Sequence, residues 1–468
     1  WAALVAPPLI GAFALALDVA RVYSLEAELQ TAADSLARAS AVELDGNPDA
    51  ITRATAAIAN LVENRQTLAT RGHSEVVVGG LRFFSSLPAS DDAPITSAYE
   101  TTNPNAARFV EVAIKPEAVR TIFPPSMAQG LVSVSLSAKA VGGRVKRMCG
   151  AAPLFICNPF EGSGQSLEAA LKDRTVRGRL VAFKSKGTEA TYFPGNFGYL
   201  EPPGGNGANE LRDMFAKVNP GACYDAAGVV LRTGAVNSAG QGLNVRFDIY
   251  EGSFKGSKND PAFAPAVNVT KGWSGANCNN APNASAMGLP RDNCFATGNC
   301  PHMSGRMGDG TWNVAAYMKV NHGSPASAVI GGVTYTFNYA SNTVTPATPP
   351  TRYEVYRWEI TNGKIPGTSG YTASTTPENG APQCYSGGTP SDTPDRRLLP
   401  VAVIDCQALD DAYDLNGGST PPLPVRGFVK VFLTEPMGGS EDTIWGEIVG
   451  MVEWGVDVVA RDQVEVRR

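Results

Sequence analysis

The sequence has little charge and little histidine, and it lacks the short motifs of common active sites. Charged residues make up only 18% of the 468 residues, and the net charge is −5. That balance excludes the basic surface that nucleic-acid binding requires, so we expect no nucleic-acid partner. The three histidines lie far apart, and we expect each of them at the surface. No HExxH, GxSxG or GxxxxGK[ST] motif occurs, and no GxGxxG follows a predicted strand, which predicts a protein that is not an enzyme and uses no cofactor.

Paired cysteine motifs are also absent, which removes the usual signatures of zinc and c-type haem. All eight cysteines follow residue 145. An even, clustered set favours disulfides formed in an oxidising compartment over the alternative of eight buried thiols. The pairing stays open, although Cys149–Cys157 and Cys294–Cys300 are the easiest local closures. The disulfide candidates are Cys149, Cys157, Cys223, Cys278, Cys294, Cys300, Cys384 and Cys406.

One acidic turn, DDAYDLNGGS at 410–419, is a candidate for binding calcium. Its oxygen ligands would come from Asp410, Asp411, Asp414 and Asn416, and Ca²⁺ prefers such ligands. The spacing does not fit an EF-hand loop, and the glutamate that ends that loop is missing. We therefore favour the alternative of an ordinary acidic turn and predict no metal.

Charge is absent from the first 17 residues, WAALVAPPLIGAFALAL, and the helical pattern then continues past Asp18. A membrane span needs about 20 apolar residues, so this run is slightly short. Beyond Asp18, apolar residues recur at steps of three and four, which predicts one long helix that ends near Asp45-Gly46-Asn47-Pro48. The residues expected to contact a membrane or to pack against another helix are Leu4, Val5, Leu9, Ile10, Phe13, Leu15, Leu17, Asp18, Arg21, Val22, Leu25 and Leu29.

Asp18 is interpreted as the point where hydrocarbon ends and water begins, with Arg21 one turn away as its ion-pair partner. From Asp18 to Gln66 there are eight acidic residues and four arginines, and an acidic flank favours the outer side of a membrane. A signal peptide fits poorly, because the run continues directly into a helix. The remaining alternative is a buried helix of a soluble protein.

The rest of the chain predicts an α+β fold in three parts: a helix and stalk at 1–46, a small α+β unit at 47–147, and a β-rich, sandwich-like ectodomain with long loops at 148–468. A second helix is expected at 47–66 and a short one at 208–217. Short apolar runs between Gly- and Pro-rich stretches predict the strands of the ectodomain. These runs are 180–184, 228–232, 243–250, 329–337, 352–360, 400–404, 426–434 and 444–453.

The start of the chain resembles the TadE/TadG family of tight-adherence (Tad, Flp-type) pilus assembly proteins. The resemblance lies in an apolar run that ends in LDVARVY, followed by LEAELQTAADSLARAS, and in a pair of strands expected at 106–142. Stretches such as MCGAAPLFICNPFE (148–161) and TRYEVYRWEI (351–360) are similar to the long ectodomain of TadG-related proteins. No DxSxS occurs, so the metal site of the von Willebrand A domain found in some TadG proteins is not expected here.

The resemblance implies a non-enzymatic structural component that supports pilus assembly or anchoring. Its N-terminal helix would lie in the inner membrane with the ectodomain in the periplasm. One alternative is a pilin-like subunit of an extracellular filament or of its tip, with the helix packed in the filament core; another is a surface adhesin. The partners implied are the membrane, other Tad pilus components, or copies of the same chain bound through the N-terminal helix.

Overall fold

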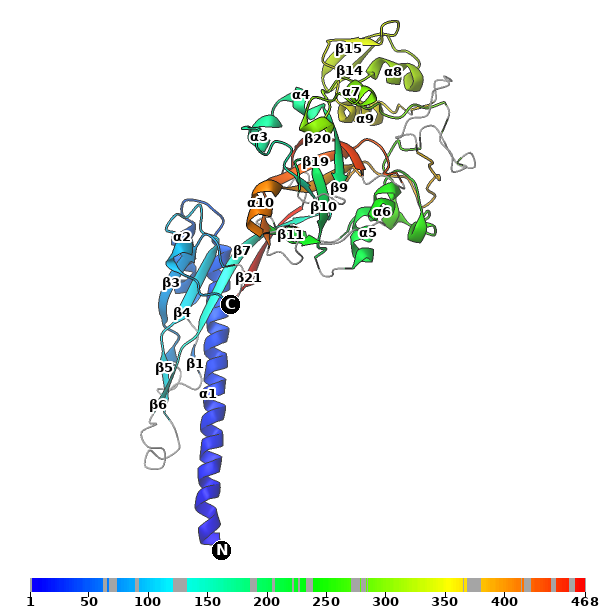
Figure 1. Cartoon of the computed structure of the whole chain (residues 1–468). Helices are drawn as coiled ribbons and strands as arrows, with labels where there is room; N and C mark the ends of the chain where they lie inside the picture. Colours follow the sequence, from blue (N-terminus) through cyan, green and yellow to red (C-terminus); the bar gives the residue numbers. More distant parts are fainter. Residues whose placement is uncertain are drawn as a thin grey trace. The chain divides into compact units, whose positions relative to one another are not determined.

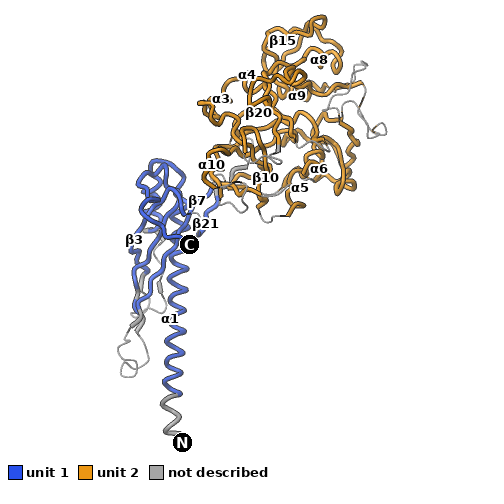
Figure 2. Tube along the Cα trace, in the orientation of Figure 1, with its two compact units in different colours: residues 1–146, 462–468 blue, residues 147–461 orange. Residues whose placement is uncertain are grey.

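The computed structural model places the chain in two compact units. Unit 1 comprises residues 1–146 and 462–468, and unit 2 comprises residues 147–461 (Figure 2). The structure describes residues 2–61, 65–66, 74–88, 92–120, 133–185, 192–203, 207–220, 223–225, 228–232, 239–270, 278, 283, 285–364, 366–367, 380–413, 415, 422–438, 443–453 and 459–467. The fold is α+β, as predicted, and it begins with the long N-terminal helix (Figure 1).

Unit 1 is an antiparallel sheet with two helices. Strands β3, β4 and β7 are neighbours in that order, and β21 pairs with β7. The elements are α1 (Ala2–Val42), α2 (Ala50–Leu61), β1 (Arg65–Gln66), β2 (Ser74–Glu75), β3 (Val78–Phe84), η1 (Ser97–Tyr99), β4 (Phe109–Ile114), β5 (Glu117–Arg120), β6 (Ser133–Leu136), β7 (Lys139–Cys149) and β21 (Val459–Val466). The strand pair expected at 106–142 and the second helix are therefore present.

The C-terminal half of α1 is held on this sheet by apolar packing. Leu25 and Leu29 are completely buried, as are Val110 and Val112 on the inner face of β4. These side chains share one core with the apolar face of α2. Burial of each large aliphatic side chain contributes about 1.5–3 kcal/mol, so this half of α1 is part of the folded unit.

The turn between α1 and α2 is fixed by one arginine among three carboxylates. Arg53 lies 2.5 Å from Glu43, 2.6 Å from Asp45 and 3.0 Å from Asp49. Gly46 has a φ of +85°, a left-handed conformation that glycine adopts without strain. The expected stop at Asp45-Gly46-Asn47-Pro48 thus coincides with the end of α1, three residues after Val42.

Unit 2 is built on a six-stranded closed barrel, in the order β10, β8, β17, β19, β20 and β9. The barrel closes because β9 and β10 pair in parallel, with Asn196 opposite Lys184 and Phe197 opposite Ser185. This corrects the expected sandwich-like arrangement. Alternating patterns in the sequence predict individual strands. The pairing that joins the two edges of a sheet involves residues far apart in the chain, and no local sequence pattern indicates it.

The strands and helices of unit 2 are mixed along the chain. The strands are β8 (Leu154–Cys157), β9 (Leu180–Ser185), β10 (Asn196–Leu200), β11 (Cys223–Asp225), β12 (Gly228–Val229), β13 (Leu231–Arg232), β14 (Ser327–Ile330), β15 (Val333–Asn338), β16 (Thr343–Thr345), β17 (Leu398–Ile404), β18 (Leu423–Pro424), β19 (Gly427–Leu433) and β20 (Thr443–Met451). The helices are α3 (Leu167–Ala170), α4 (Arg174–Arg177), α5 (Ala208–Ala216), α6 (Ala239–Val245), α7 (Asn293–Thr297), α8 (Val314–His322), α9 (Arg352–Thr361) and α10 (Cys406–Tyr413), with 3-10 turns η2 (Gly252–Phe254), η3 (Pro261–Phe263) and η5 (Met303–Gly305).

Two predicted strands, 243–250 and 352–360, are wrong. The first begins inside α6, and the second is α9. Helix α9 starts in a capping box, in which the Thr351 side chain accepts from the Glu354 backbone and Glu354 accepts from Thr351. That local hydrogen bonding outweighs the strand preference of the aromatic residues in this stretch.

A fully buried ion network then fixes α9 to the barrel. Arg352 lies 2.7 Å from Glu447 of β20 and 2.5 Å from Asp292, and all three side chains are inaccessible to solvent. The Glu447 carboxylate also accepts hydrogen bonds from the backbone N–H groups of Arg352 and Tyr353. The first turn of α9 is thereby capped by a strand of the barrel.

All eight cysteines are paired in disulfides. The bonds are Cys149–Cys223, Cys157–Cys406, Cys278–Cys384 and Cys294–Cys300. Of the two local closures, Cys294–Cys300 forms. Cys149–Cys157 does not, because Cys149 lies opposite Cys223 on β11 and Cys157 lies on β8.

The expectation of three surface histidines fails at His322. Its side chain is 4% exposed, and its Nε2 atom lies 2.9 Å from Oε1 of Glu359. The same oxygen accepts a hydrogen bond of 2.6 Å from Tyr317. His322 ends α8, and its ring packs against Tyr317 of α8 and Trp358 of α9, a placement that the Gly-flanked sequence does not indicate.

Candidate functional site

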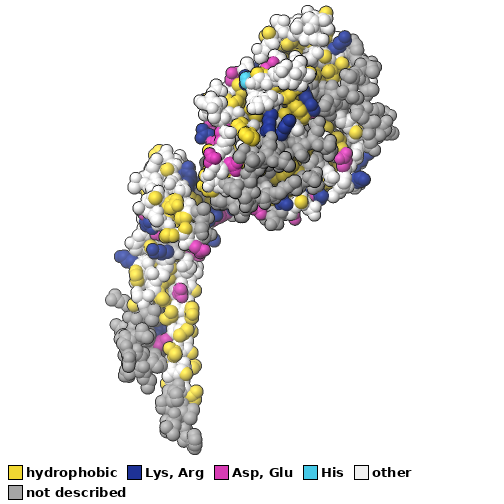
Figure 3. Space-filling model, viewed as in Figure 1, with side chains coloured by type: hydrophobic (Ala, Val, Ile, Leu, Met, Phe, Trp, Pro, Cys, Tyr) yellow, Lys and Arg dark blue, Asp and Glu magenta, His cyan; other side chains and the backbone are white. Residues whose placement is uncertain are grey.

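The N-terminal half of α1 carries the main exposed apolar surface of unit 1. Figure 1 shows this half of the helix extending beyond strands β3, β4 and β7, and Figure 3 shows hydrophobic side chains along the part of it whose side chains are described. Folded proteins rarely leave so many large apolar side chains in water unless they bind lipid or another protein. The exposed fractions are Leu9 63%, Ile10 68%, Phe13 69%, Leu15 54%, Leu17 40%, Val19 46% and Tyr23 67%.

A second stripe of α1 faces the body of unit 1. Asp18 is 5% exposed, and Leu25 and Leu29 are completely buried on the same side of the helix. Residues 18, 22, 25 and 29 recur at steps of three and four, so they form one continuous stripe. Asp18 therefore lies on the inward face, and the outward face carries no charged side chain between Leu9 and Ala20.

Asp18 and Arg21 form the ion pair that the sequence suggested. The Nη1 atom of Arg21 lies 3.9 Å from Oδ1 of Asp18. The side chain of Arg21 is 30% exposed and that of Asp18 is 7% exposed. Val22 is half-buried beside them. Leu4 and Val5 belong to α1, but their side chains lie outside the described residues.

The sequence pattern missed two members of the exposed set, Val19 and Tyr23. Both follow Asp18, where the sequence was interpreted as already outside the apolar environment. A helical projection of residues 9–24 places Val19 and Tyr23 beside Ala12 and Ala16, on the outward side of the helix. In the part of the chain that the structure describes, no helix combines the length and the apolar character that crossing a membrane requires.

Small residues run along the outward face as well. Ala12, Ala16, Ala20 and Ser24 are all exposed and follow one another at intervals of four. Helices that carry small residues at this spacing can approach each other closely, in lipid or in a bundle. The outward face of α1 therefore combines a smooth groove with large apolar ridges.

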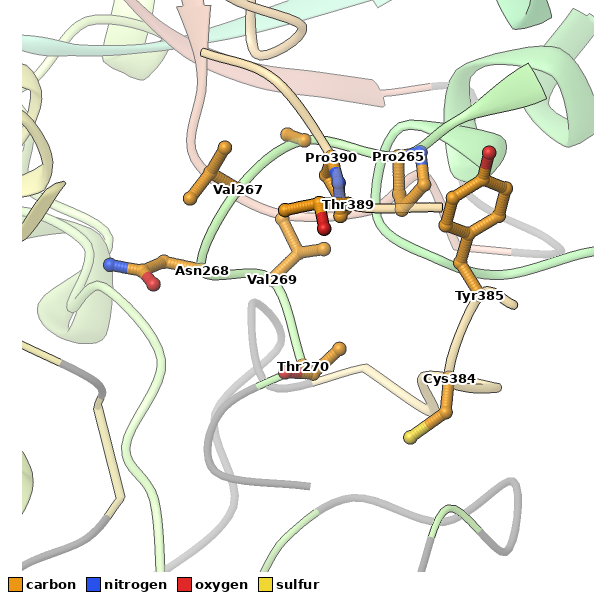
Figure 4. Close-up of a pocket in the computed structure, with 10 residues that line it drawn as sticks. Pro265, Val267, Asn268, Val269, Thr270, Cys384, Tyr385, Thr389 and Pro390 are labelled. Atoms are coloured by element: carbon orange, nitrogen blue, oxygen red, sulfur yellow. The ribbon is translucent and has the colours of Figure 1, made fainter. Parts of the chain in front are cut away.

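Unit 2 contains a separate cavity of about 290 Å³. The cavity is lined by residues 265–270 and by Cys384, Tyr385, Thr389 and Pro390 of a second segment (Figure 4). No side chain among these residues carries a charge, and the Asn268 amide already donates to the Lys364 carbonyl at 2.9 Å. The described lining contains no Asp, Glu, His or Lys side chain, and its cysteine is held in a disulfide.

A buried aspartate holds one side of this cavity in place. Asp248 accepts hydrogen bonds from the backbone N–H of Cys384 at 2.6 Å and of Tyr385 at 2.9 Å. Its own φ is +63°, which suits a short polar side chain better than a bulky one. Burial raises the pKa of Asp248 to about 6, although the two N–H groups act in the opposite direction.

The calcium candidates are not brought together by the described part of the chain. Asp410 and Asp411 lie on α10, and an oxygen of Asp410 accepts from the Leu415 backbone at 2.9 Å. Asp414 and Asn416 lie outside the described residues. No group of three or more His, Cys, Asp or Glu side chains that could hold a metal occurs among the residues described.

Comparison with known families matches the same segment that carries the exposed apolar surface. Residues 1–43 match the Flp pilus-assembly TadE/G-like family, named Tad. The N-terminal segment is thus TadE/G-like, which confirms the resemblance drawn from LDVARVY and the helix after it. The match indicates a pilus-related component with a place in the cell envelope or at the cell surface. No curated protein and no solved structure shows significant similarity to the chain.

Proposed function

We propose that this chain is a non-enzymatic structural component of a Tad-type pilus system, anchored in the inner membrane by α1 with its ectodomain outside the cytoplasm. The observation that carries the proposal is the outward face of α1. It lies in the segment that matches the pilus-assembly family, and it leaves seven large apolar side chains exposed. Transfer of this surface from water into an apolar environment is favourable by about 25 cal/mol for each Å² of apolar surface that is buried.

With α1 as the anchor, each part of the chain has a separate role. Within unit 1, residues 1–46 form the helix and stalk, and the remaining residues form a small α+β unit that holds the stalk; unit 2, residues 147–461, is the ectodomain. Four disulfides in the last part support an oxidising compartment, which agrees with a periplasmic or surface position. Other pilus components are the partners that such a protein would engage.

A filament subunit is the second candidate, and one observation favours it. The exposed small residues at 12, 16, 20 and 24 of α1 suit close helix packing. In that case copies of α1 would cover one another in the core of a filament or of its tip. A role as a surface adhesin would instead place function in the ectodomain.

Fractionation of native cells tests these alternatives. Sheared surface filaments and washed, carbonate-extracted membranes are compared for the amount of this chain, with N-terminal mass spectrometry on each. An anchored component stays in the extracted membranes after shearing, and a filament subunit leaves with the filaments. Recovery of the chain in neither fraction, as a free protein, would contradict both roles.

A further inference from the structure

One exposed segment of unit 2 is free of charge over an unusual length. No Asp, Glu, Lys or Arg occurs from Gly323 to Thr351, in a chain where these residues make up 18% of positions. The segment forms the antiparallel sheet β14–β15–β16, in which β14 and β16 are the edge strands. Exposed edge strands usually carry charges that prevent pairing with other chains. Another kind of protection is therefore expected here.

Hydroxyl groups take the place of the missing charges. One face of the sheet packs on α8 and α9 through Ile330, Tyr335 and Phe337. The opposite face is exposed and consists mostly of small polar side chains, with Thr336 directly opposite Thr345. Its members are Ser327, Val329, Thr334, Thr336, Asn338, Thr343 and Thr345.

The chain that leaves β16 has the composition of a glycosylated segment. Residues 341–350 read SNTVTPATPP, and Thr345 and Thr348 each precede a proline. Stretches rich in Ser, Thr and Pro are typical of O-glycosylated segments. Every residue from Ser341 to Thr348 is exposed except the half-buried Val344.

The hydroxyl groups in this segment differ in their hydrogen bonding. Ser341 and Thr343 are hydrogen-bonded to each other at 2.8 Å. Within the described residues, the hydroxyls of Thr345 and Thr348 have no hydrogen-bond partner. Thr345 ends the edge strand β16 and Thr348 follows it, so a modifying enzyme can reach both hydroxyls without opening the sheet.

From this geometry we propose that Thr345 and Thr348 are O-glycosylated in the native protein. In the reaction, Oγ1 of threonine attacks the anomeric carbon of a sugar that a glycosyltransferase holds as a diphosphate-linked donor. The bond between that carbon and the diphosphate oxygen breaks, the diphosphate leaves, and the hydroxyl proton passes to a base of the transferase. The attached sugars would cover the uncharged edge strand and keep it from pairing with other chains.

Other threonines serve as internal references. Thr351 is 9% exposed, and its side chain accepts from the Glu354 backbone as the cap of α9. Thr393 also precedes a proline, but it lies between acidic residues and its hydroxyl points to Asp392 at 3.5 Å. Thr336 is exposed but belongs to the central strand β15. The proposal assigns sugar to none of these three.

Trypsin provides a direct test, because the charge-free segment yields one peptide, from Val320 to Arg352. Native protein is digested, and this peptide is analysed by mass spectrometry with fragmentation that keeps the sugar attached. We expect a mass excess of one or more monosaccharide residues on Thr345 and Thr348. The double variant Thr345→Val with Thr348→Val should lose the excess completely, and Thr336→Val should keep it.

An unmodified Val320–Arg352 peptide at full abundance in native protein would overturn the proposal. Sugar found only on Thr334 or Thr336 would overturn the assignment to the edge segment. The glycosylation proposal rests on the proposed function only in assuming that the ectodomain lies outside the cytoplasm. Fractionation measures the location of the chain and mass spectrometry measures the attached sugar, so the two proposals can fail separately.

Discussion

Gly142 of β7 lies directly against the backbone of Ala37 in α1. A Cβ atom at position 142 would stand 2.3 Å from the Ala37 carbonyl oxygen and 3.2 Å from Cβ of Ala41. The helix therefore approaches the sheet at a point where only hydrogen fits. We expect Gly142→Ala to lower the free energy of unfolding of unit 1 by about 1–3 kcal/mol, the usual cost of overpacking. Urea denaturation of the full chain, followed by hydrogen exchange of α1 and β4 peptides, measures this loss.

Gly80 of β3 gives the matched control for that variant. A Cβ atom there would meet no heavy atom within 4 Å. Gly80→Ala should leave stability unchanged or raise it slightly, because alanine restricts the unfolded chain. Equal losses in the two variants would show that the contact at Ala37 is not what makes Gly142 necessary.

The buried pair of Arg352 and Glu447 should be far more sensitive than any surface pair. Arg352→Met leaves the Glu447 carboxylate buried without its guanidinium, which costs about 3–5 kcal/mol. Arg357, on the same helix, is 36% exposed and pairs with Asp392 at 3.2 Å. Arg357→Met should cost less than about 1 kcal/mol. Calorimetry of both variants checks the difference, and similar melting temperatures would refute a fixing role for the network.

Asp248 should make the stability of unit 2 depend on pH. Burial raises the pKa of Asp248 from 3.8 to about 6, so the folded state favours the protonated carboxyl. Its contribution to stability is complete below about pH 4 and is lost as the pH rises through about 6. We expect Asp248→Asn to remove this part of the pH dependence. Denaturation midpoints at several pH values, for wild type and variant, give the difference; parallel curves would be the contrary result.

The disulfides should differ in their effect because they close loops of different length. Cys157 and Cys406 are separated by 249 residues, and Cys294 and Cys300 by six. On the chain-entropy model, removing the long closure costs about 3 kcal/mol more than removing the short one. Replacing each pair by alanine and measuring the free energy of unfolding tests this. A larger loss for the short pair would mean that local packing around α7, and not loop closure, sets the effect.

The sequence was informative wherever a local pattern decides the structure. The three- and four-residue repeat beyond Asp18 predicted α1, and alternating valines predicted β4. TRYEVYRWEI becomes α9 for a local and a distant reason: the capping box of Thr351 and Glu354 could have been found in the sequence, whereas the hydrogen bonds from its first turn to Glu447 of β20 could not. The closure of the barrel at Asn196 and Lys184 is of the distant kind. For the candidate site, periodicity identified the right helix, but only packing in unit 1 shows that Asp18 faces inward.

The two halves of α1 should respond in opposite ways to the same kind of substitution. Phe13 is 69% exposed, so Phe13→Glu should leave unit 1 folded and reduce association with membranes or filaments by at least tenfold, since a charge is costly in an apolar surrounding. Leu25 is completely buried, and Leu25→Glu should unfold unit 1. Phe193→Glu, at an exposed site of unit 2, is the control and should change neither property. Circular dichroism reports folding, and the amount in sheared filaments and extracted membranes reports association. Normal association of a folded Phe13→Glu protein would show that the outward face of α1 is not needed for association with membranes or filaments.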